Sequence, residues 1–256
     1  MSLVEHYIRN IKKFKDSSIV SIDPIKHGTI NQNYIVSTDQ NKYFVRINNT
    51  NVAGINRENE SAILNKLSKL NIIPKIFENN IEKGYLILEY LPLKHWTKDN
   101  CIHNQSSLLK ILSLVHQIDL PIGFPQLLSR LDDYEYNSRG FSSKKFRKRY
   151  HNNKQILNDL GFFEINKLVH FDLNSRNILG VDPLYLIDWE FAGAAHPIFD
   201  LALFVYYNKL KTHQYTLIIN YCNQYENGDK ILKYAIKLAK HMTKMWEMIQ
   251  NKSPPQ

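Results

Sequence analysis

The sequence predicts an α+β protein with two lobes. Short runs of β-branched and aromatic residues dominate the beginning of the chain and predict a small antiparallel β-rich lobe over residues 1–91. Beyond Leu91-Pro92, apolar residues recur at intervals of three and four, which predicts a larger, mostly helical lobe over residues 92–256. The chain has 256 residues, of which 43% are apolar, and this is enough material for a core in each lobe.

The N-terminal lobe is predicted to contain a helix, three strands, a second helix and two more strands. Apolar residues at helical spacing place the first helix over residues 4–14. The second helix is expected over residues 55–70, with Ile63, Leu64 and Leu67 on one face. The five strands are separated by polar turns and are expected over residues 19–25, 33–37, 42–47, 75–77 and 85–89. The first three strands should form an antiparallel meander.

The C-terminal lobe is predicted to be helical around residues 108–115, over residues 141–157 and over most of residues 199–249. Three short apolar segments, 167–170, 178–179 and 184–187, interrupt the helical pattern and are separated by polar loops. We expect these loops to present polar side chains at the ends of short strands.

Composition and charge exclude several classes of protein. Nine Gly and nine Pro are too few for a collagen-like chain, and the apolar content excludes wholesale disorder. Cys101 and Cys222 match no disulfide or zinc spacing. We find no signal-peptide pattern and no apolar run near the roughly 18 residues of a membrane span, so we expect a cytoplasmic protein. The net charge of +9 favours anionic partners but does not choose among them.

The strongest motif is His170-Phe-Asp172-Leu-Asn-Ser-Arg-Asn177, followed by Asp188 at the end of an apolar run. Phosphoryl transfer needs a carboxylate that accepts the proton of the attacking hydroxyl, and Mg²⁺ to neutralise charge on the phosphates of ATP. We expect Asp172 to be this base, and Asn177 and Asp188 to offer oxygen ligands to Mg²⁺. The alternative interpretation is that both aspartates cap turns and that Asn177 is one of many Asn residues.

Two further motifs follow along the chain. Ile187-Asp188-Trp189-Glu190-Phe191-Ala192-Gly193 is similar to the choline kinase pattern I-D-[FW]-E-Y-[SA]-G, and the motif around Asp172 fits the kinase catalytic loop H-x-D-L-x-x-x-N. Pro197-Ile-Phe-Asp200-Leu-Ala202 resembles D-P-x-x-D-L-A, with His196 at the usually acidic position. The sequence thus resembles the choline kinase and aminoglycoside phosphotransferase group. This resemblance implies a two-lobed protein-kinase-like fold that uses ATP and Mg²⁺.

Within this motif set, His170 and Asp200 are expected to support the catalytic loop by hydrogen bonds to its backbone. A His in such a pattern is more often structural than a general base, and Asp172 already fills that role.

The same resemblance implies phosphate contacts in the N-terminal lobe. His27-Gly28-Thr-Ile-Asn31 is similar to the loop that covers the nucleotide phosphates in choline kinases, which assigns Gly28 and Asn31 to the nucleotide. An ordinary hairpin turn is the alternative. Arg46 stands where protein kinases carry a phosphate-binding Lys, and a guanidinium group can also bind phosphate oxygens.

Two further nucleotide assignments concern the neighbourhood of Arg46 and the end of the lobe. Glu60 is the expected ion-pair partner of Arg46, with Glu58 as its rival. A solvated helix charge is the alternative interpretation of either residue. The backbone from Glu89 to Leu91 resembles the hinge that contacts adenine.

The acceptor is expected to be a small cationic alcohol. His241-Met-Thr-Lys-Met-Trp246 resembles the C-terminal stretch of choline kinases, so Trp246 is a candidate wall of a cation pocket, with Trp189 and Glu190 as further contributors. A Trp in an apolar helix can equally be part of the core. Choline is the first candidate and thiamine the second, followed by ethanolamine and aminoglycosides.

Two functions of a different class remain. The basic residues between Lys144 and Arg149 could contact nucleic-acid phosphates, although such runs are usually solvated helix faces and too few aromatic residues accompany them here. A nucleotide-binding pseudokinase is the other alternative, but Asp172, Asn177 and Asp188 are all present, which argues against it.

Overall fold

The computed structural model of the chain describes residues 3–15, 17–25, 30–49, 52, 54–121 and 123–251. The chain forms two compact units, Met1–Leu93 and Lys94–Gln256. The predicted boundary after residue 91 therefore lies two residues before the division that the structure shows.

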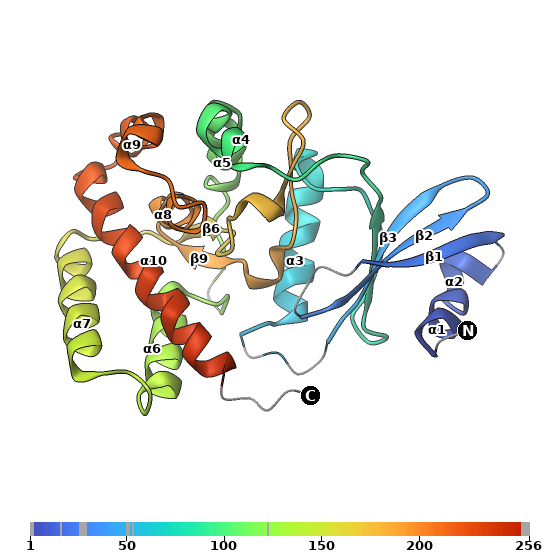
Figure 1. Cartoon of the computed structure of the whole chain (residues 1–256), viewed down its shortest axis with the longest axis horizontal. Coiled ribbons are helices and arrows are strands. Elements are labelled where there is room, and N and C mark those ends of the chain that lie inside the picture. The colour runs from blue at the N-terminus through green and yellow to red at the C-terminus, as the bar shows by residue number, and fades with distance from the viewer. Residues whose placement is uncertain are drawn as a thin grey trace. The chain divides into compact units, whose positions relative to one another are not determined.

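The first unit is built on a five-stranded antiparallel sheet with the strand order β1-β2-β3-β5-β4 (Figure 1). The strands are β1 (Ile19–Ile25), β2 (Gln32–Thr38), β3 (Lys42–Ile47), β4 (Ile76–Asn80) and β5 (Tyr85–Glu89). The predicted meander is formed by the first three of them. Helix α3 (Arg57–Leu67) and a 3₁₀ turn, η1 (Ser68–Leu70), cover residues 57–70 of the second helix predicted over 55–70.

The ends of α3 follow from local side-chain chemistry. The Asn56 side chain accepts a hydrogen bond from the backbone N–H of Asn59 and caps the N-terminus at 2.8 Å. Asn71 then adopts a left-handed conformation with φ of 55° and stops the helix. Ile63, Leu64 and Leu67 are buried as their spacing predicts.

The prediction of one continuous N-terminal helix was wrong. The structure contains two short helices, α1 (Leu3–Arg9) and α2 (Lys12–Lys15). The side-chain amide of Asn10 donates to the His6 carbonyl at 2.8 Å and so competes with the helical backbone at the break. Ile8, Ile11 and Phe14 are nevertheless buried in one cluster with the sheet, so the apolar spacing correctly identified the buried face.

The second unit is mostly helical, and α10 is its longest helix (Figure 1). Its helices are α4 (Lys98–His103), α5 (Gln105–Val115), α6 (Leu127–Ser138), α7 (Lys144–Asp159), α8 (Ile198–Tyr207), α9 (Thr216–Cys222) and α10 (Gly228–Gln250). Helix α8 is buried from Ile198 to Val205, and α10 packs against α6, α7, α8 and α9. Helices α4 and α6 were not predicted.

Two small antiparallel ladders hold the loops between these helices. Strand β6 (Lys167–Val169) pairs with β9 (Gly193–Ala195), and β7 (Ile178–Leu179) pairs with β8 (Tyr185–Leu186). The apolar segments predicted β6, β7 and β8, whereas β9 was not predicted because Gly-Ala-Ala lacks β-branched and aromatic residues. Among the described residues, no helix combines the length and the apolar character that crossing a membrane requires.

Candidate active site

The carboxylate of Asp172 is held by two amide side chains from its own loop. Asn174 Nδ2 donates to Asp172 Oδ1 at 3.0 Å, and Asn177 Nδ2 donates to Oδ2 at 2.9 Å. Burial raises the pKa of Asp172, while His170 and the two asparagine hydrogen bonds oppose this rise. A carboxylate with a raised pKa is a better proton acceptor once ionised, and its orientation is fixed by the two amides.

His170 does not have a ring nitrogen available for proton transfer. Its Nε2 lies 2.8 Å from the Ile187 carbonyl, which only a protonated nitrogen can approach as a donor. Its Nδ1 accepts from the Asp172 backbone N–H at 3.3 Å. Both ring nitrogens are therefore engaged, and His170 connects the Asp172 loop to the segment that leads to Asp188.

Asp200 is completely buried and orients the start of the same loop. Its carboxylate accepts from the backbone N–H of His170 at 2.9 Å and of Phe171 at 3.1 Å, and from His116 Nε2 at 3.1 Å. Phe171 has a φ of 63°, a conformation that an aromatic residue rarely adopts. The hydrogen bonds to Asp200 hold this strained turn, which directs the next residue, Asp172.

Asn177 and Asp188 lie at the same end of the β7–β8 hairpin. Ile178 pairs with Leu186, and the Ile187 N–H donates to the Asn177 carbonyl at 3.0 Å, so Asp188 follows directly after the residue opposite Asn177. Asp188 is exposed and has a φ of 67°, which turns the chain sharply at this point.

This donor set fits Mg²⁺. The amide nitrogen of Asn177 is engaged by Asp172, so its oxygen is the atom left to face a cation, and Asp188 offers a carboxylate. Mg²⁺ at nucleotide sites takes one or two protein oxygens and completes its shell with phosphates and water. The described residues contain no group of three His, Cys, Asp or Glu side chains placed to hold a metal by themselves.

The residues assigned to the acceptor differ in their accessibility. Trp189 is only 1% exposed, its indole N–H donates to the Leu186 carbonyl at 3.0 Å, and its ring packs against His170. This burial favours a packing role over the predicted acceptor contact. Glu190 is also buried, and its charge contributes to the raised pKa of Asp172. Trp246 is partly exposed on α10.

In the first unit, Arg46 on β3 pairs with Glu60 on α3. The distance from Arg46 Nη2 to Glu60 Oε2 is 2.7 Å, and both residues are buried. Arg57 contacts the same Oε2 at 2.7 Å and also donates to Asn31 Oδ1 at 2.8 Å. Two guanidinium groups thus contact one carboxylate oxygen. Of the two glutamates considered, Glu60 is the one that contacts Arg46, not Glu58.

The remaining nucleotide assignments are Gly28 and the segment from Glu89 to Leu91. Gly28 lies outside the described residues. Glu89 is the last residue of β5, where its N–H donates to the Lys75 carbonyl at 2.8 Å, and Leu91 follows in an irregular segment beyond the sheet.

Asn174 and Arg57 were missed from the sequence, as were Arg130 and Tyr207, which interact electrostatically with Asp172. The spacing of Arg57 and Glu60, three residues apart on one helix, is a signal that could have identified Arg57. The Tyr207 pKa is raised by burial and then by the nearby charge of Asp172, and its hydroxyl lies 3.4 Å from Thr243 Oγ1. Arg130 lies on α6 and Tyr207 is the last residue of α8, seven residues after Asp200, and nothing local marks either of them.

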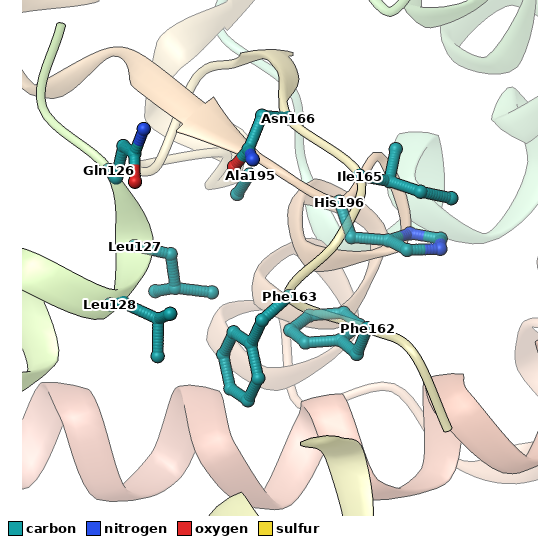
Figure 2. A pocket seen from close by; sticks show the side chains of 9 residues that line it. All are labelled: Gln126, Leu127, Leu128, Phe162, Phe163, Ile165, Asn166, Ala195 and His196. Atoms are coloured by element: carbon teal, nitrogen blue, oxygen red, sulfur yellow. The ribbon is translucent and has the colours of Figure 1, made fainter. Parts of the chain in front are cut away.

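The second unit also has a small pocket that is lined by none of the predicted site residues (Figure 2). Its volume of about 10 Å³ is close to that of one water molecule, so it is too small for an organic substrate. It is lined by Gln126, Leu127, Leu128, Phe162, Phe163, Ile165, Asn166, Ala195 and His196.

Comparison with known proteins identifies the family. A model described as the phosphotransferase enzyme family matches residues 21–229. The chain belongs to this family. The match includes every predicted site residue except Trp246, and family membership confirms the prediction of a phosphotransferase.

Individual relatives of this phosphotransferase are distant in sequence. Protein LicA of Haemophilus influenzae is 24% identical over 238 residues, which cover 88% of this chain and 68% of the relative. The crystal structure of choline kinase LicA from Streptococcus pneumoniae has a TM-score of 0.83 at 21% identity, covering 100% of this chain and 93% of that one. A choline/ethanolamine kinase family protein from Mesorhizobium loti has a TM-score of 0.80 at 15% identity, covering 99% and 87%. These similarities confirm the predicted kinase-like fold.

Proposed function

We propose that this phosphotransferase moves the γ-phosphate of ATP to the hydroxyl group of choline, with Mg²⁺ as cofactor. The observation that carries the proposal is the Asp172 carboxylate, which has each oxygen fixed by an amide and has Asn177 and Asp188 at the end of the adjoining hairpin. ATP as the phosphate donor would place the reaction in the cytoplasm.

In this reaction Asp172 orients the acceptor hydroxyl and takes its proton. The hydroxyl oxygen forms a bond to the γ-phosphorus, the bond from that phosphorus to the bridging oxygen breaks, and ADP leaves. Asn177 and Asp188 would hold Mg²⁺, which supplies positive charge to the phosphate oxygens. Asn177 would thus have two roles, because its nitrogen orients the base and its oxygen would be the ligand for Mg²⁺.

The first unit is proposed to bind the nucleotide. The guanidinium groups of Arg46 and Arg57, which meet at Glu60, are of the kind that binds phosphate oxygens. Gly28 and Asn31 would lie along the phosphates, and the backbone from Glu89 to Leu91 would contact adenine. Among the structural neighbours, one is a LicA complex with AMP and another is an aminoglycoside phosphotransferase, APH(4)-Ia, with ADP and hygromycin B.

The choice of choline is supported by the named relatives and by aromatic groups in the second unit. A choline kinase is among the most similar structures. A quaternary ammonium has no N–H to donate, so aromatic rings and negative charge must bind it, at about 0.5–2 kcal/mol per ring. Tyr207 lies close enough to Asp172 for that charge to contribute to the raised pKa of Tyr207. Glu190 adds negative charge, and Trp246 has a partly exposed ring. We assign Trp189 to the packing beneath this site.

The test is a screen of the purified full-length chain with ATP, Mg²⁺ and one acceptor at a time. Choline, ethanolamine, thiamine and an aminoglycoside are compared by ADP release, and phosphocholine is identified by mass spectrometry. We expect the highest kcat/KM with choline and no turnover by Asp172→Ala. No choline-dependent ADP release, or equal turnover by this variant, would refute the proposal.

A further inference from the structure

Arg130 is a buried cation with an unusual environment. It lies on α6, is 7% exposed, and has no carboxylate within ion-pairing distance among the described residues. Burial lowers its pKa, as expected for a guanidinium group taken from water. Burying a charge without an ionic partner is costly unless other contacts replace the lost water. The contacts that do so indicate what the residue contributes.

Arg130 contacts both segments that carry the catalytic carboxylates. Its Nη2 donates to the Phe191 carbonyl at 2.8 Å, three residues beyond Asp188. Its guanidinium carbon lies 4.3 Å from the centre of the Phe171 ring, and Phe171 directly precedes Asp172. A second cation–π contact reaches the Phe191 ring at 5.8 Å. One side chain thus bridges the loop of Asp172 and the turn that follows Asp188.

The Phe171 ring is enclosed on its other sides as well. The Phe199 ring meets it edge-on at 5.7 Å between centroids. At Gly193 a Cβ atom would lie 3.2 Å from Phe171 Cε2, so the ring also packs close to β9. The backbone N–H of Phe171 is bound by Asp200 at 3.1 Å. Arg130 therefore completes the enclosure of a residue whose backbone is in a strained conformation.

The charge of Arg130 is favoured by the reactive carboxylate. Asp172 acts to raise the pKa of Arg130, against the larger effect of burial, and so stabilises its charged form. Asp172 is attracted to Arg130 without an ion pair between them. This leaves both Asp172 oxygens to Asn174 and Asn177.

We propose that Arg130 is a positioning residue for phosphate transfer. It fixes the Phe171 ring and the Phe191 carbonyl together, and so keeps the Asp172 loop and the Asp188 turn in one arrangement. The expected effect of Arg130 on turnover rests on the proposed function. Its effect on the arrangement of the Asp172 loop and the Asp188 turn does not.

The kinetic test compares Arg130→Met, Arg130→Lys and the control Arg139→Met, which makes the same change at an exposed arginine that follows α6. Loss of positioning should lower kcat of Arg130→Met by about 10- to 100-fold, with KM for ATP and choline within about threefold of wild type. Arg130→Lys keeps a cation for the Phe171 ring and should restore at least half of the lost rate on a logarithmic scale. The control should match wild type.

Amide hydrogen exchange tests the same contacts without any substrate. The Phe171 N–H is bound by Asp200, and the Ala192 N–H by the Trp189 carbonyl at 3.0 Å. The exchange rate of both amides should rise at least about tenfold in Arg130→Met and should not change in Arg139→Met. If Arg130→Met does not fold, the same two measurements on Arg130→Lys decide, with smaller changes of the same sign expected.

The proposal is overturned if a folded Arg130 variant keeps kcat within twofold of wild type, or if KM rises by as much as kcat falls. Unchanged exchange at Phe171 and Ala192 overturns it as well. If the wild-type chain does not phosphorylate choline, the proposed function fails, while the exchange data still decide the role of Arg130.

Discussion

Replacing Asp200 by Asn should destabilise the second unit and reduce turnover, although Asp200 does not touch a substrate. The buried carboxylate accepts hydrogen bonds from the His170 and Phe171 amides and from His116 Nε2. An Asn side chain removes the charge and keeps only one accepting oxygen. If this oxygen faces the two amides, the new NH₂ group faces His116, whose buried Nδ1 already has no hydrogen-bond partner among the residues that the structure describes.

The size of the effect follows from these contacts. A hydrogen bond to a charged group contributes about 1.5–3 kcal/mol and one between neutral groups about 0.5–1.5 kcal/mol, so each bond loses about 1 kcal/mol. With three donors affected, we expect a loss of about 3 kcal/mol in the free energy of unfolding. For a chain of this size the corresponding fall in Tm is about 6–12 °C. The same change should loosen the turn at Phe171 and lower kcat more than it raises either KM.

Thermal unfolding and steady-state kinetics of Asp200→Asn measure both effects. Asp133→Asn is the matched control, because Asp133 is exposed on α6 and should leave Tm and kcat unchanged. A Tm within about 2 °C of wild type would show that the three hydrogen bonds do not carry the energy assigned to them. A lower Tm with unchanged kcat would show that Asp200 stabilises the fold but does not control the orientation of Asp172.

The other predictions concern single side chains around the same site. Asp172→Asn should lower kcat by about 10²–10⁴-fold. Since burial raises the pKa of Asp172, its ionised form destabilises the folded state; the variant should therefore have a higher Tm at pH 7, and this gain should disappear below about pH 4. Asp188→Asn should weaken ATP binding at least about tenfold with Mg²⁺ present and leave binding in EDTA unchanged, as calorimetry can measure. Gly193→Ala should lower Tm and kcat together, because its Cβ would lie 2.4 Å from the Pro125 carbonyl oxygen. Trp246→Ala should raise KM for choline by about three- to 30-fold and leave KM for ATP unchanged in the same kinetic assay.

The parts of the fold that were predicted from the sequence are those with a regular pattern. The β-rich runs and the apolar face of α3 predicted the elements of the first unit in order. Helix α6 was missed because Arg130 and Ser138 lie on its buried face and weaken the apolar pattern. Strand β9 consists of small residues that are selected for close packing, since Gly193 lies against the Pro125 carbonyl and Phe171.

The site shows a similar division. The spacing of Asp172, Asn177 and Asp188 is a local property of the loop and hairpin, and the structure indeed places the last two at one hairpin end. The contact between Arg46 and Glu60 could also be anticipated, because one lies in a strand and the other on the following helix. The role of Arg130 could not be predicted, because its partners are 41 and 61 residues away in the chain (Phe171 and Phe191) and are determined only by tertiary packing.

The strain of the site is concentrated beside its two carboxylates. Phe171 and Asp188 both have positive φ angles, of 63° and 67°, in positions where such angles cost about 1–3 kcal/mol each. The positive φ of Phe171 turns the chain just before Asp172, and the positive φ of Asp188 turns it at the second carboxylate itself. Each turn is held by hydrogen bonds of the neighbouring backbone. The anchors are hydrogen bonds to Asp200 for the first turn and the β7–β8 ladder for the second. If Asp172 and Asp188 did not have to point into the site, both residues with positive φ could relax and the fold would be more stable. At these two positions the conformation that orients the carboxylates is therefore the less stable one.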